Sequence, residues 1–174
     1  MELKFRLLKP NEIDCRIATI NEKGLTLLLY KDARVDQNIL DETVGPMNWQ
    51  RHHSRDNANC TISIWDIDKK QWVEKEDTGT ESYTEKEKGL ASDSFKRAGF
   101  NWGIGRELYS APFIWINATD VKITKGNNGK YQSYDKFAVE QILYDDNREI
   151  VALSIKNINQ NKRVFVMDKR PKNK

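Results

Sequence analysis

Basic side chains interleaved with aromatic rings are the residues of this sequence whose types and spacing best fit a chemical task. Lys96, Arg97 and Phe100 fall within five consecutive residues. Proteins hold single-stranded nucleic acid through cations that contact phosphates and rings that stack on bases, without reading the base sequence. We therefore treat these residues as a candidate nucleic-acid surface, to which the sequence adds Arg51, Arg55, Lys69, Lys70 and Arg106.

Several of these residues also have ordinary structural explanations. Trp49, in "NWQRHHSR", is either a stacking platform or part of the core. Lys69 and Lys70 suit a polar turn, and Phe100 can stack on a base, touch another subunit or pack within the chain. Arg106 follows a predicted helix, so it contacts DNA, caps the last carbonyls or pairs with a carboxylate.

Acidic residues offer an enzymatic alternative. Four of them lie close enough in the sequence to hold Mg²⁺ as in a nuclease: Asp66, Asp68, Glu74 and Glu76. Solvent-facing residues of a hairpin would show the same spacing. His52 and His53 are adjacent, and neighbours on an extended segment point to opposite sides, so we interpret them as exposed loop residues rather than metal ligands.

The glycines of "GIGREL" do not form a nucleotide site. A dinucleotide fingerprint follows a strand and opens a helix, whereas Gly103 and Gly105 follow a helical stretch, and Leu108 stands where the third glycine is required. The sequence contains no Walker A string and no recognisable nucleophile motif. We expect Gly103 or Gly105 to be a left-handed C-cap, and we expect neither a cofactor nor an enzymatic reaction.

The stretch after Thr84 is predicted to be the dominant helix, opened by a capping box of Thr84 and Glu87. At about 100° per residue, one broad face is predicted to be buried: Leu90, Ala91, Ser94, Phe95, Ala98 and Trp102. The opposite side holds the Lys96–Arg97 pair, with Asp93 one turn before Arg97 as an ion-pair partner. A strip of small residues predicts that another backbone approaches closely: Gly89, Ser92, Gly99 and Gly103.

Alternating hydrophobicity and turn residues predict the other elements. These are strands at 12–20 and 25–30, a helix from Ala33 to Thr43 capped by Asp32 and ended by Gly45, a hairpin of "NCTISIWDID" and "QWVEKED", a second hairpin of 137–144 and 149–156, and a last strand in "RVFVM". The predicted fold class is α+β, with mostly antiparallel strands and one dominant helix.

Composition limits the class of protein. A chain of 174 residues with 38% hydrophobic residues can form one domain with a core. Cys15 and Cys60 show neither metal nor disulfide spacing, which favours a reducing compartment. The first residues hold no apolar signal segment and no run is long enough to span a bilayer, so we expect a cytoplasmic protein without a membrane partner.

The net charge of +3 is concentrated towards the C-terminal end. Residues 156–174 hold seven basic residues against one acid, Asp168, which leaves 22 basic and 25 acidic residues in the rest. Such a basic arm either follows a polyanion or is a solvated end. We place one domain at residues 1–168 and a basic tail at 169–174.

Three stretches in order resemble a known family. "YKDARVDQNILDETVGPMNWQ", "ISIWDIDKKQWVEKEDTGTES" and "EKEKGLASDSFKRAGFNWGIGRELY" resemble the Rad fifty-two superfamily of single-strand annealing proteins, particularly its phage Sak and bacterial DdrA-like branch. The resemblance covers roughly residues 10–116 and is most specific at 88–109.

The resemblance implies both a fold and a function. It implies a curved antiparallel sheet with hairpins packed on the long helix, plus a short N-terminal helix and a β-rich C-terminal extension. It also implies a recombinase that binds single-stranded DNA and anneals complementary strands without ATP, in homologous recombination or DNA repair. Such proteins are homo-oligomers, rings or filaments, with DNA in an outer basic groove.

The family also suggests site residues. Its lysine–arginine pair matches Lys96 and Arg97, and its groove-lining hairpin matches residues 60–76, which include Lys69 and Lys70. Eukaryotic members often carry a further basic residue one turn after the pair, where this sequence has Phe100 and Asn101. Double-stranded DNA and a single-strand-binding protein are partners that the sequence leaves open. The alternatives to an annealing protein are a Mg²⁺-dependent nuclease and an interaction module that does not bind DNA.

Overall fold

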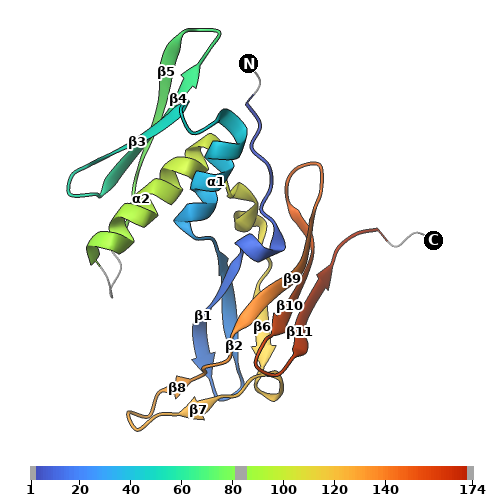
Figure 1. The fold of residues 1–174 in the computed structure, drawn as a ribbon. Coiled ribbons are helices and arrows are strands. Elements are labelled where there is room, and N and C mark those ends of the chain that lie inside the picture. The colour runs from blue at the N-terminus through green and yellow to red at the C-terminus, as the bar shows by residue number, and fades with distance from the viewer. Residues whose placement is uncertain (1–2, 81–85, 172–174) are drawn as a thin grey trace. The chain divides into compact units, whose positions relative to one another are not determined.

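The computed structural model describes residues 3–80 and 86–171, and the chain divides into two compact units (Figure 1). The first unit comprises Met1–Leu7 and Asp32–Arg106, and the second comprises Leu8–Lys31 and Glu107–Lys174. The domain predicted at residues 1–168 therefore spans both units, and each unit is formed from two separate stretches of chain.

The first unit consists of a three-stranded antiparallel sheet and two helices. The strands lie in the order β3-β4-β5 and are β3 (Trp49–Ser54), β4 (Asn59–Asp66) and β5 (Gln71–Thr78). The helices are α1 (Ala33–Val44) and α2 (Lys86–Trp102). The predicted hairpin is confirmed, with Asp66 opposite Gln71 and Asn59 opposite Thr78. Helix α2 packs against β4 and β5, so this sheet lies on the long helix as expected.

The ends of the helices follow from capping residues. Asp32 caps α1 as predicted, because its Oδ1 accepts the Arg34 N–H at 2.8 Å, and Gly45 ends that helix with φ 84°. Gly103 ends α2 in the left-handed region, with φ 101°, and its N–H donates to the Phe100 carbonyl at 3.0 Å. The predicted C-cap is therefore confirmed. The predicted capping box of Thr84 and Glu87 lies outside the residues whose side chains the structure describes.

Alternate residues of β4 form the core of the first unit together with α2. Cys60, Ile62 and Ile64 are at most 3% exposed, and Phe95 and Ala98 are fully buried. The predicted buried face of α2 is confirmed for its central residues. Four members of this face are buried: Leu90, Ser94, Phe95 and Ala98. Ala91 and Trp102 are half-buried.

Strand β3 corrects the interpretation of the two histidines as loop residues. His52 and His53 both lie on β3, which pairs with β4 from Trp49 to Ser54. His52 is exposed, whereas His53 is half-buried on the face towards α2, with its Nδ1 3.4 Å from the Ser94 hydroxyl. Burial and the charge of Arg51 lower the pKa of His53. The strand is hard to recognise from sequence because "WQRHHS" has no alternation of apolar and polar residues.

The second unit is built on a six-stranded antiparallel sheet in the order β11-β10-β9-β1-β2-β6. Its strands are β1 (Asp14–Asn21), β2 (Gly24–Tyr30), β6 (Ile114–Asn117), β9 (Phe137–Tyr144), β10 (Ile150–Asn157) and β11 (Lys162–Asp168). The predicted strands at both ends of the chain are confirmed. Strand β6, which pairs Ile116 with Leu25, was not predicted.

Short elements complete the described chain. They are the two-stranded hairpin of β7 (Thr124–Lys125) and β8 (Tyr131–Gln132), and the 3-10 helices η1 (Pro10–Glu12), η2 (Arg106–Ser110) and η3 (Ala118–Asp120). The core of the second unit comes from its long strands, with Leu25, Ile114, Ile116, Leu153 and Ile155 at most 2% exposed. Cys15 and Cys60 are free thiols in different units.

The architecture is α+β with antiparallel sheets, as predicted from the sequence. Among residues 3–80 and 86–171, no helix combines the length and the apolar character that crossing a bilayer requires.

Candidate nucleic-acid interface

Helix α2 fixes the position of the predicted Lys96–Arg97 pair. Ser94, Phe95 and Ala98 anchor one side of the helix in the core, and all three have no exposed surface. Arg97 is exposed and Lys96 is half-buried, so the pair lies off the fully buried side, as the helical spacing predicts. The pair is thus held on a rigid element with its cationic groups outside the core.

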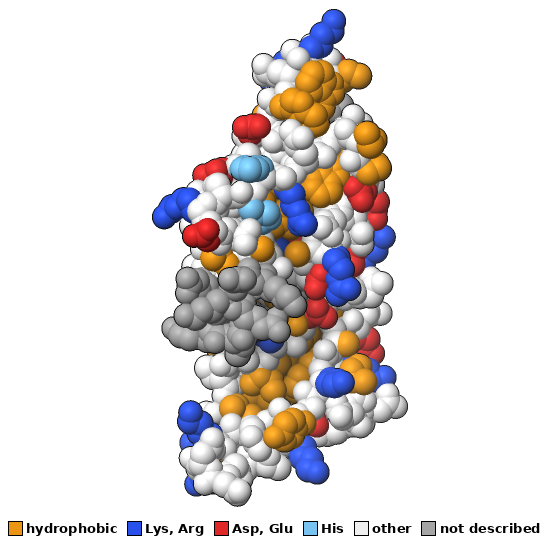
Figure 2. Space-filling view, turned by 60° about the vertical axis from the view of Figure 1, so that its left-hand side comes forward, with side chains coloured by type: hydrophobic (Ala, Val, Ile, Leu, Met, Phe, Trp, Pro, Cys, Tyr) orange, Lys and Arg blue, Asp and Glu red, His pale blue; other side chains and the backbone are white. Residues whose placement is uncertain are grey.

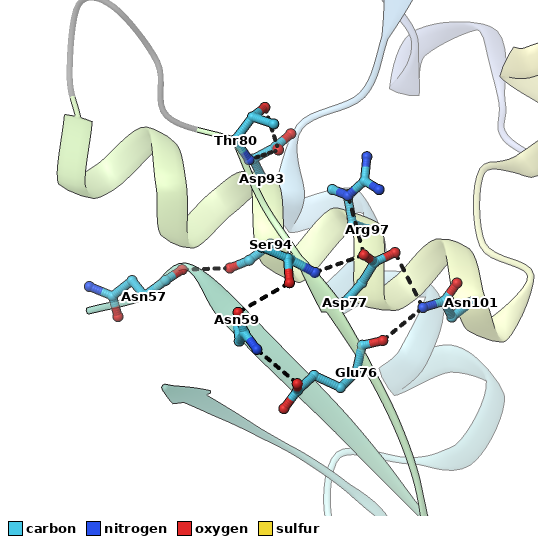
Figure 3. Close-up of polar contacts among 10 residues, drawn as sticks. Asn57, Asn59, Glu76, Asp77, Thr80, Asp93, Ser94, Arg97 and Asn101 are labelled. Atoms are coloured by element: carbon cyan, nitrogen blue, oxygen red, sulfur yellow. Dashed lines mark hydrogen bonds and ion pairs between the residues drawn. The ribbon is translucent and has the colours of Figure 1, made fainter. Parts of the chain in front are cut away.

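The guanidinium of Arg97 forms an ion pair with Asp77 of β5 (Figure 3). The Arg97 Nε lies 3.4 Å from the Asp77 Oδ1, and the side chains are 46% and 24% exposed. Asp77 also accepts from the Thr78 N–H at 2.7 Å and from the Asn101 side-chain amide at 3.3 Å. A phosphate that binds Arg97 must therefore compete with a carboxylate that the sheet holds in place.

The partner predicted for Arg97 is engaged elsewhere. Asp93 accepts hydrogen bonds from the N–H and the hydroxyl of Thr80, at 2.8 and 3.2 Å (Figure 3). The ion pair of Arg97 therefore crosses from the helix to the sheet instead of following the helix. This difference arises because β5 brings Asp77 alongside α2, which the helical spacing of the sequence does not reveal.

Lys96 keeps its ammonium group free of ion pairs with the described residues. Its charge reaches Asp32 at the start of α1. The pKa of Asp32 is lowered chiefly by its hydrogen bonds with Arg34, and Lys96 adds a smaller electrostatic contribution. Lys96 is therefore the member of the pair whose charge is more available to a phosphate.

Lys69 and Lys70 occupy the turn of the β4–β5 hairpin. Lys69 forms an exposed ion pair with Asp66 at 3.5 Å, and Lys70 adopts a positive φ of 52°. Asp66 also accepts the backbone N–H groups of Asp68 and Lys69. Hydrogen bonding from the Lys69 backbone is the largest effect that lowers the pKa of Asp66. The lysines therefore do form a polar turn, on which their ammonium groups remain exposed.

The turn lies far along the sheet from the α2 pair. Asp77, beside Arg97, is seven residues from Lys70, which directly precedes β5, and this corresponds to about 23 Å at roughly 3.3 Å per residue. Arg55 lies at the opposite end of the same sheet, in the β3–β4 turn, with φ 49°. The structure does not bring the β4–β5 turn and the β3–β4 turn together into one cluster.

Trp49, for which the sequence left two roles open, packs within the first unit. Trp49 stacks on Phe95 with ring centroids 6.1 Å apart, and its indole N–H donates to the Asp41 carboxylate at 2.7 Å. The Arg51 guanidinium also lies over the Phe95 ring, 4.9 Å from its centroid. Trp49 is therefore half-buried against the core residue Phe95, whereas Arg51 packs on the same ring and remains exposed.

Arg106 caps the end of α2. Its Nε and Nη2 donate to the carbonyls of Phe100 and Asn101, at 2.7 and 2.9 Å, and its guanidinium lies 5.3 Å from the Phe100 ring centroid. Of the roles considered for Arg106, the capping role is the one that the geometry shows. Phe100 is half-buried under this cation.

The four acids of the nuclease alternative do not converge. In the β4–β5 ladder, Glu74 is opposite Ser63 and Glu76 is opposite Thr61, and both carboxylates accept hydrogen bonds from these hydroxyls at 3.0 Å. Asp66 belongs to the alternate set of β4 residues, which points to the other face of the sheet. Across the described part of the chain, no group of three or more acidic, histidine or cysteine residues could hold a metal ion.

The sequence analysis overlooked two features of this sheet. Lys75 points towards α2, donates to the Asn101 carbonyl at 2.9 Å and lies 4.6 Å from the Trp102 ring centroid. Trp65 and Trp72 pair edge to face across the hairpin at 5.5 Å, next to the Lys69–Lys70 turn. Lys75 is two residues from Val73 on β5, so strand alternation places both side chains on the same face of the sheet. The register of the predicted hairpin likewise places Trp65 opposite Trp72.

The basic side chains do not form a continuous patch in the view of Figure 2. There, basic and acidic side chains are interspersed, and hydrophobic atoms gather near the end occupied by the β4–β5 hairpin. Comparisons of the chain with protein-family models, curated proteins and solved structures give no match.

Proposed function

We propose that the chain binds single-stranded DNA through α2 and the β4–β5 hairpin and anneals complementary strands without ATP. The observation that carries the proposal is the placement of Lys96 and Arg97 on a helix whose other side is buried, with both side chains outside the core. The resemblance of residues 88–109 to annealing proteins supports the same assignment.

Annealing requires no covalent step. Two strands must be held by their phosphates with the bases accessible, and the paired product must be released. Lys96, Lys70 and the exposed face of Arg97 can supply such contacts, whose strength comes largely from the release of counterions. Because exposed ion pairs contribute only about 0–1 kcal/mol, exchange of Asp77 for a phosphate at Arg97 has a small cost.

A double substitution tests the site. We expect Lys96→Ala with Arg97→Ala to weaken binding equally for oligonucleotides of different sequence, because phosphate contacts carry no sequence information. Loss of these contacts should reduce the slope of log K against log salt by about 0.7 to 1.4, at roughly 0.7 per contact, with the lower figure if Asp77 keeps the Arg97 charge from the phosphate. Fluorescence anisotropy of labelled oligonucleotides over a salt series measures both quantities.

The matched control is Lys9→Ala with Arg16→Ala. It also removes one lysine and one arginine, both exposed, and both lie in the second unit. Unchanged binding in a folded Lys96–Arg97 variant would remove the pair from the site. Wild-type binding that does not depend on salt would indicate a protein-interaction module, and cleavage of labelled DNA that EDTA abolishes would indicate a nuclease.

A further inference from the structure

The positive charge in the described part of the C-terminal end, residues 156–171, is partly neutralised within the second unit. Three of the five described basic residues at 156–171 form ion pairs: Lys162 with Asp120, Arg163 with Glu140 at 2.6 Å, and Arg170 with Asp168 at 2.6 Å. Two of these pairs join β11 to other parts of the unit. This end of the chain therefore offers less free charge than its composition predicts.

Unpaired positive charge gathers instead on the β7–β8 hairpin, residues 121–136. Its four lysines are exposed and form no ion pair with any described residue: Lys122, Lys125, Lys130 and Lys136. The segment contains one acid, Asp135, so four positive charges against one negative charge give +3. This equals the net charge of the whole chain.

Asp135 acts as the anchor of the hairpin and not as a partner of its ammonium groups. Its Oδ2 accepts from the Lys122 backbone N–H at 2.9 Å and from the side-chain amides of Asn157 and Gln160, at 2.7 and 3.0 Å. Burial alone would raise the pKa of Asp135, but these hydrogen bonds and the nearby charge of Lys122 outweigh it and lower the pKa. The carboxylate therefore ties the base of the hairpin to β10 and the turn that follows it.

The backbone of the β7–β8 hairpin places one lysine on each side of its turn. Lys125 is paired with Tyr131 across the two strands, and its Nζ lies 5.6 Å from the centroid of that ring. The Gly126 N–H donates to the Lys130 carbonyl at 2.9 Å, and Gly129 takes the left-handed conformation that the turn needs, with φ 77°. Lys125 and Lys130 thus flank a turn whose geometry is fixed.

An aromatic ring accompanies this charge. Tyr134 is 77% exposed, between Asp135 and the end of β8. Tyr131 is half-buried below Lys125, and its hydroxyl donates to Glu22 at 3.3 Å. Tyr134 is therefore the ring of the hairpin that a base can reach.

We propose that the β7–β8 hairpin is a further contact for single-stranded nucleic acid, in which Lys125 and Lys130 bind phosphates and Tyr134 stacks on an unpaired base. Spaced cations with an exposed ring are the combination that single strands require. An anionic membrane surface would also attract the lysines, but membrane-surface segments bury an apolar face, which this polar ribbon lacks. The inference rests on the proposed function and adds contacts in a unit that contains none of the α2 residues.

The test uses the full chain, labelled oligothymidylate and anisotropy over a salt series. We expect Lys125→Gln with Lys130→Gln to reduce the slope of log K against log salt by about 1.4. Lys9→Gln with Arg16→Gln, which removes the same charge from exposed sites elsewhere in the second unit, should leave the slope unchanged. Tyr134→Ala should weaken binding at least about fivefold, whereas Phe113→Ala, at an equally exposed ring, should not.

The outcomes distinguish failure of the β7–β8 assignment from failure of the proposed function. If the wild type does not bind the oligonucleotide, the proposed function fails. If the Lys96–Arg97 variant loses slope while the Lys125–Lys130 variant does not, the hairpin assignment is overturned and the proposed function stands. The assignment is also overturned if the Lys125–Lys130 variant and its Lys9–Arg16 control lose the same amount of salt slope. The same holds if Tyr134→Ala and Phe113→Ala weaken binding equally, or if the protein binds anionic vesicles in place of DNA.

Discussion

Arg97 is a candidate DNA contact that already forms an ion pair within the protein. Its Nε faces Asp77, and Asp77 is held by the Thr78 N–H and the Asn101 amide (Figure 3). The carboxylate both orients the guanidinium and repels an approaching phosphate. Which effect is larger decides how much Arg97 contributes to binding.

Asp77→Asn separates these two effects. The asparagine keeps an oxygen that can accept the Thr78 N–H, but it removes the negative charge beside Arg97. We expect binding of single-stranded DNA to become up to about fivefold tighter, the equivalent of about 1 kcal/mol for an exposed ion pair. The salt slope should steepen by up to about 0.7, because one more cation becomes available.

Asp146→Asn is the matched control, because it makes the same charge change at an exposed residue of the second unit. Its affinity should equal that of the wild type. Weaker binding by a folded Asp77→Asn variant would mean that the carboxylate serves mainly to orient Arg97.

At the scale of elements, the approach of α1 to α2 depends on Gly99. A Cβ on Gly99 would lie 2.6 Å from the Asp36 Oδ1, and Asp36 is fully buried. The small-residue strip was predicted to meet another backbone, but at Gly99 the nearest neighbour is a side chain. Gly103, in the same strip, has no such neighbour within 4 Å and serves the left-handed cap instead.

Gly99→Ala should therefore destabilise the first unit. Alanine gains about 1 kcal/mol of helix propensity over glycine, whereas overpacking costs about 1–3 kcal/mol, so we expect a net loss of about 1 kcal/mol. Urea unfolding measures it. Ser92→Ala, at an exposed position of the same helix, should cause no loss. A Gly99→Ala protein as stable as the wild type would show that Asp36 can move aside without cost.

Local patterns predicted the elements that have strong signals. Asp32 and Gly45 marked the ends of α1, alternation marked β4, and the polar turn before it marked β10. Strand β3 is polar and β7 and β8 have two residues each, so neither a period nor a length revealed them. The division into two units was also hidden, because Met1–Leu7 joins a later stretch of chain.

The same limit applies to the candidate site. The sequence identifies which residues are basic, but their availability depends on tertiary contacts. Arg106 was among the candidate residues together with Lys96, yet its guanidinium caps the carbonyls at the end of α2. The lysines of β7–β8 were overlooked because the sequence gives no signal for the two-residue strands that bring Lys125 and Lys130 together.

For the whole molecule, dispersed cations favour assembly. A few phosphate contacts on one protomer give weak, salt-sensitive binding, whereas copies side by side on one strand multiply the contacts. We therefore expect homo-oligomers, as rings or filaments, with the strand passing from one copy to the next.

Oligonucleotide length tests this expectation. For an oligomer, affinity should continue to rise well beyond the length that one protomer can cover, because each added stretch of strand reaches another copy at high effective concentration. Mass photometry and negative-stain electron microscopy of the same samples should show particles of several protomers. A mass of 20.3 kDa with an affinity that levels off at one short length would instead establish a monomer. In that case the α2 and β7–β8 contacts of a single copy would have to hold both strands, and so small a number of phosphate contacts would give weak, salt-sensitive binding.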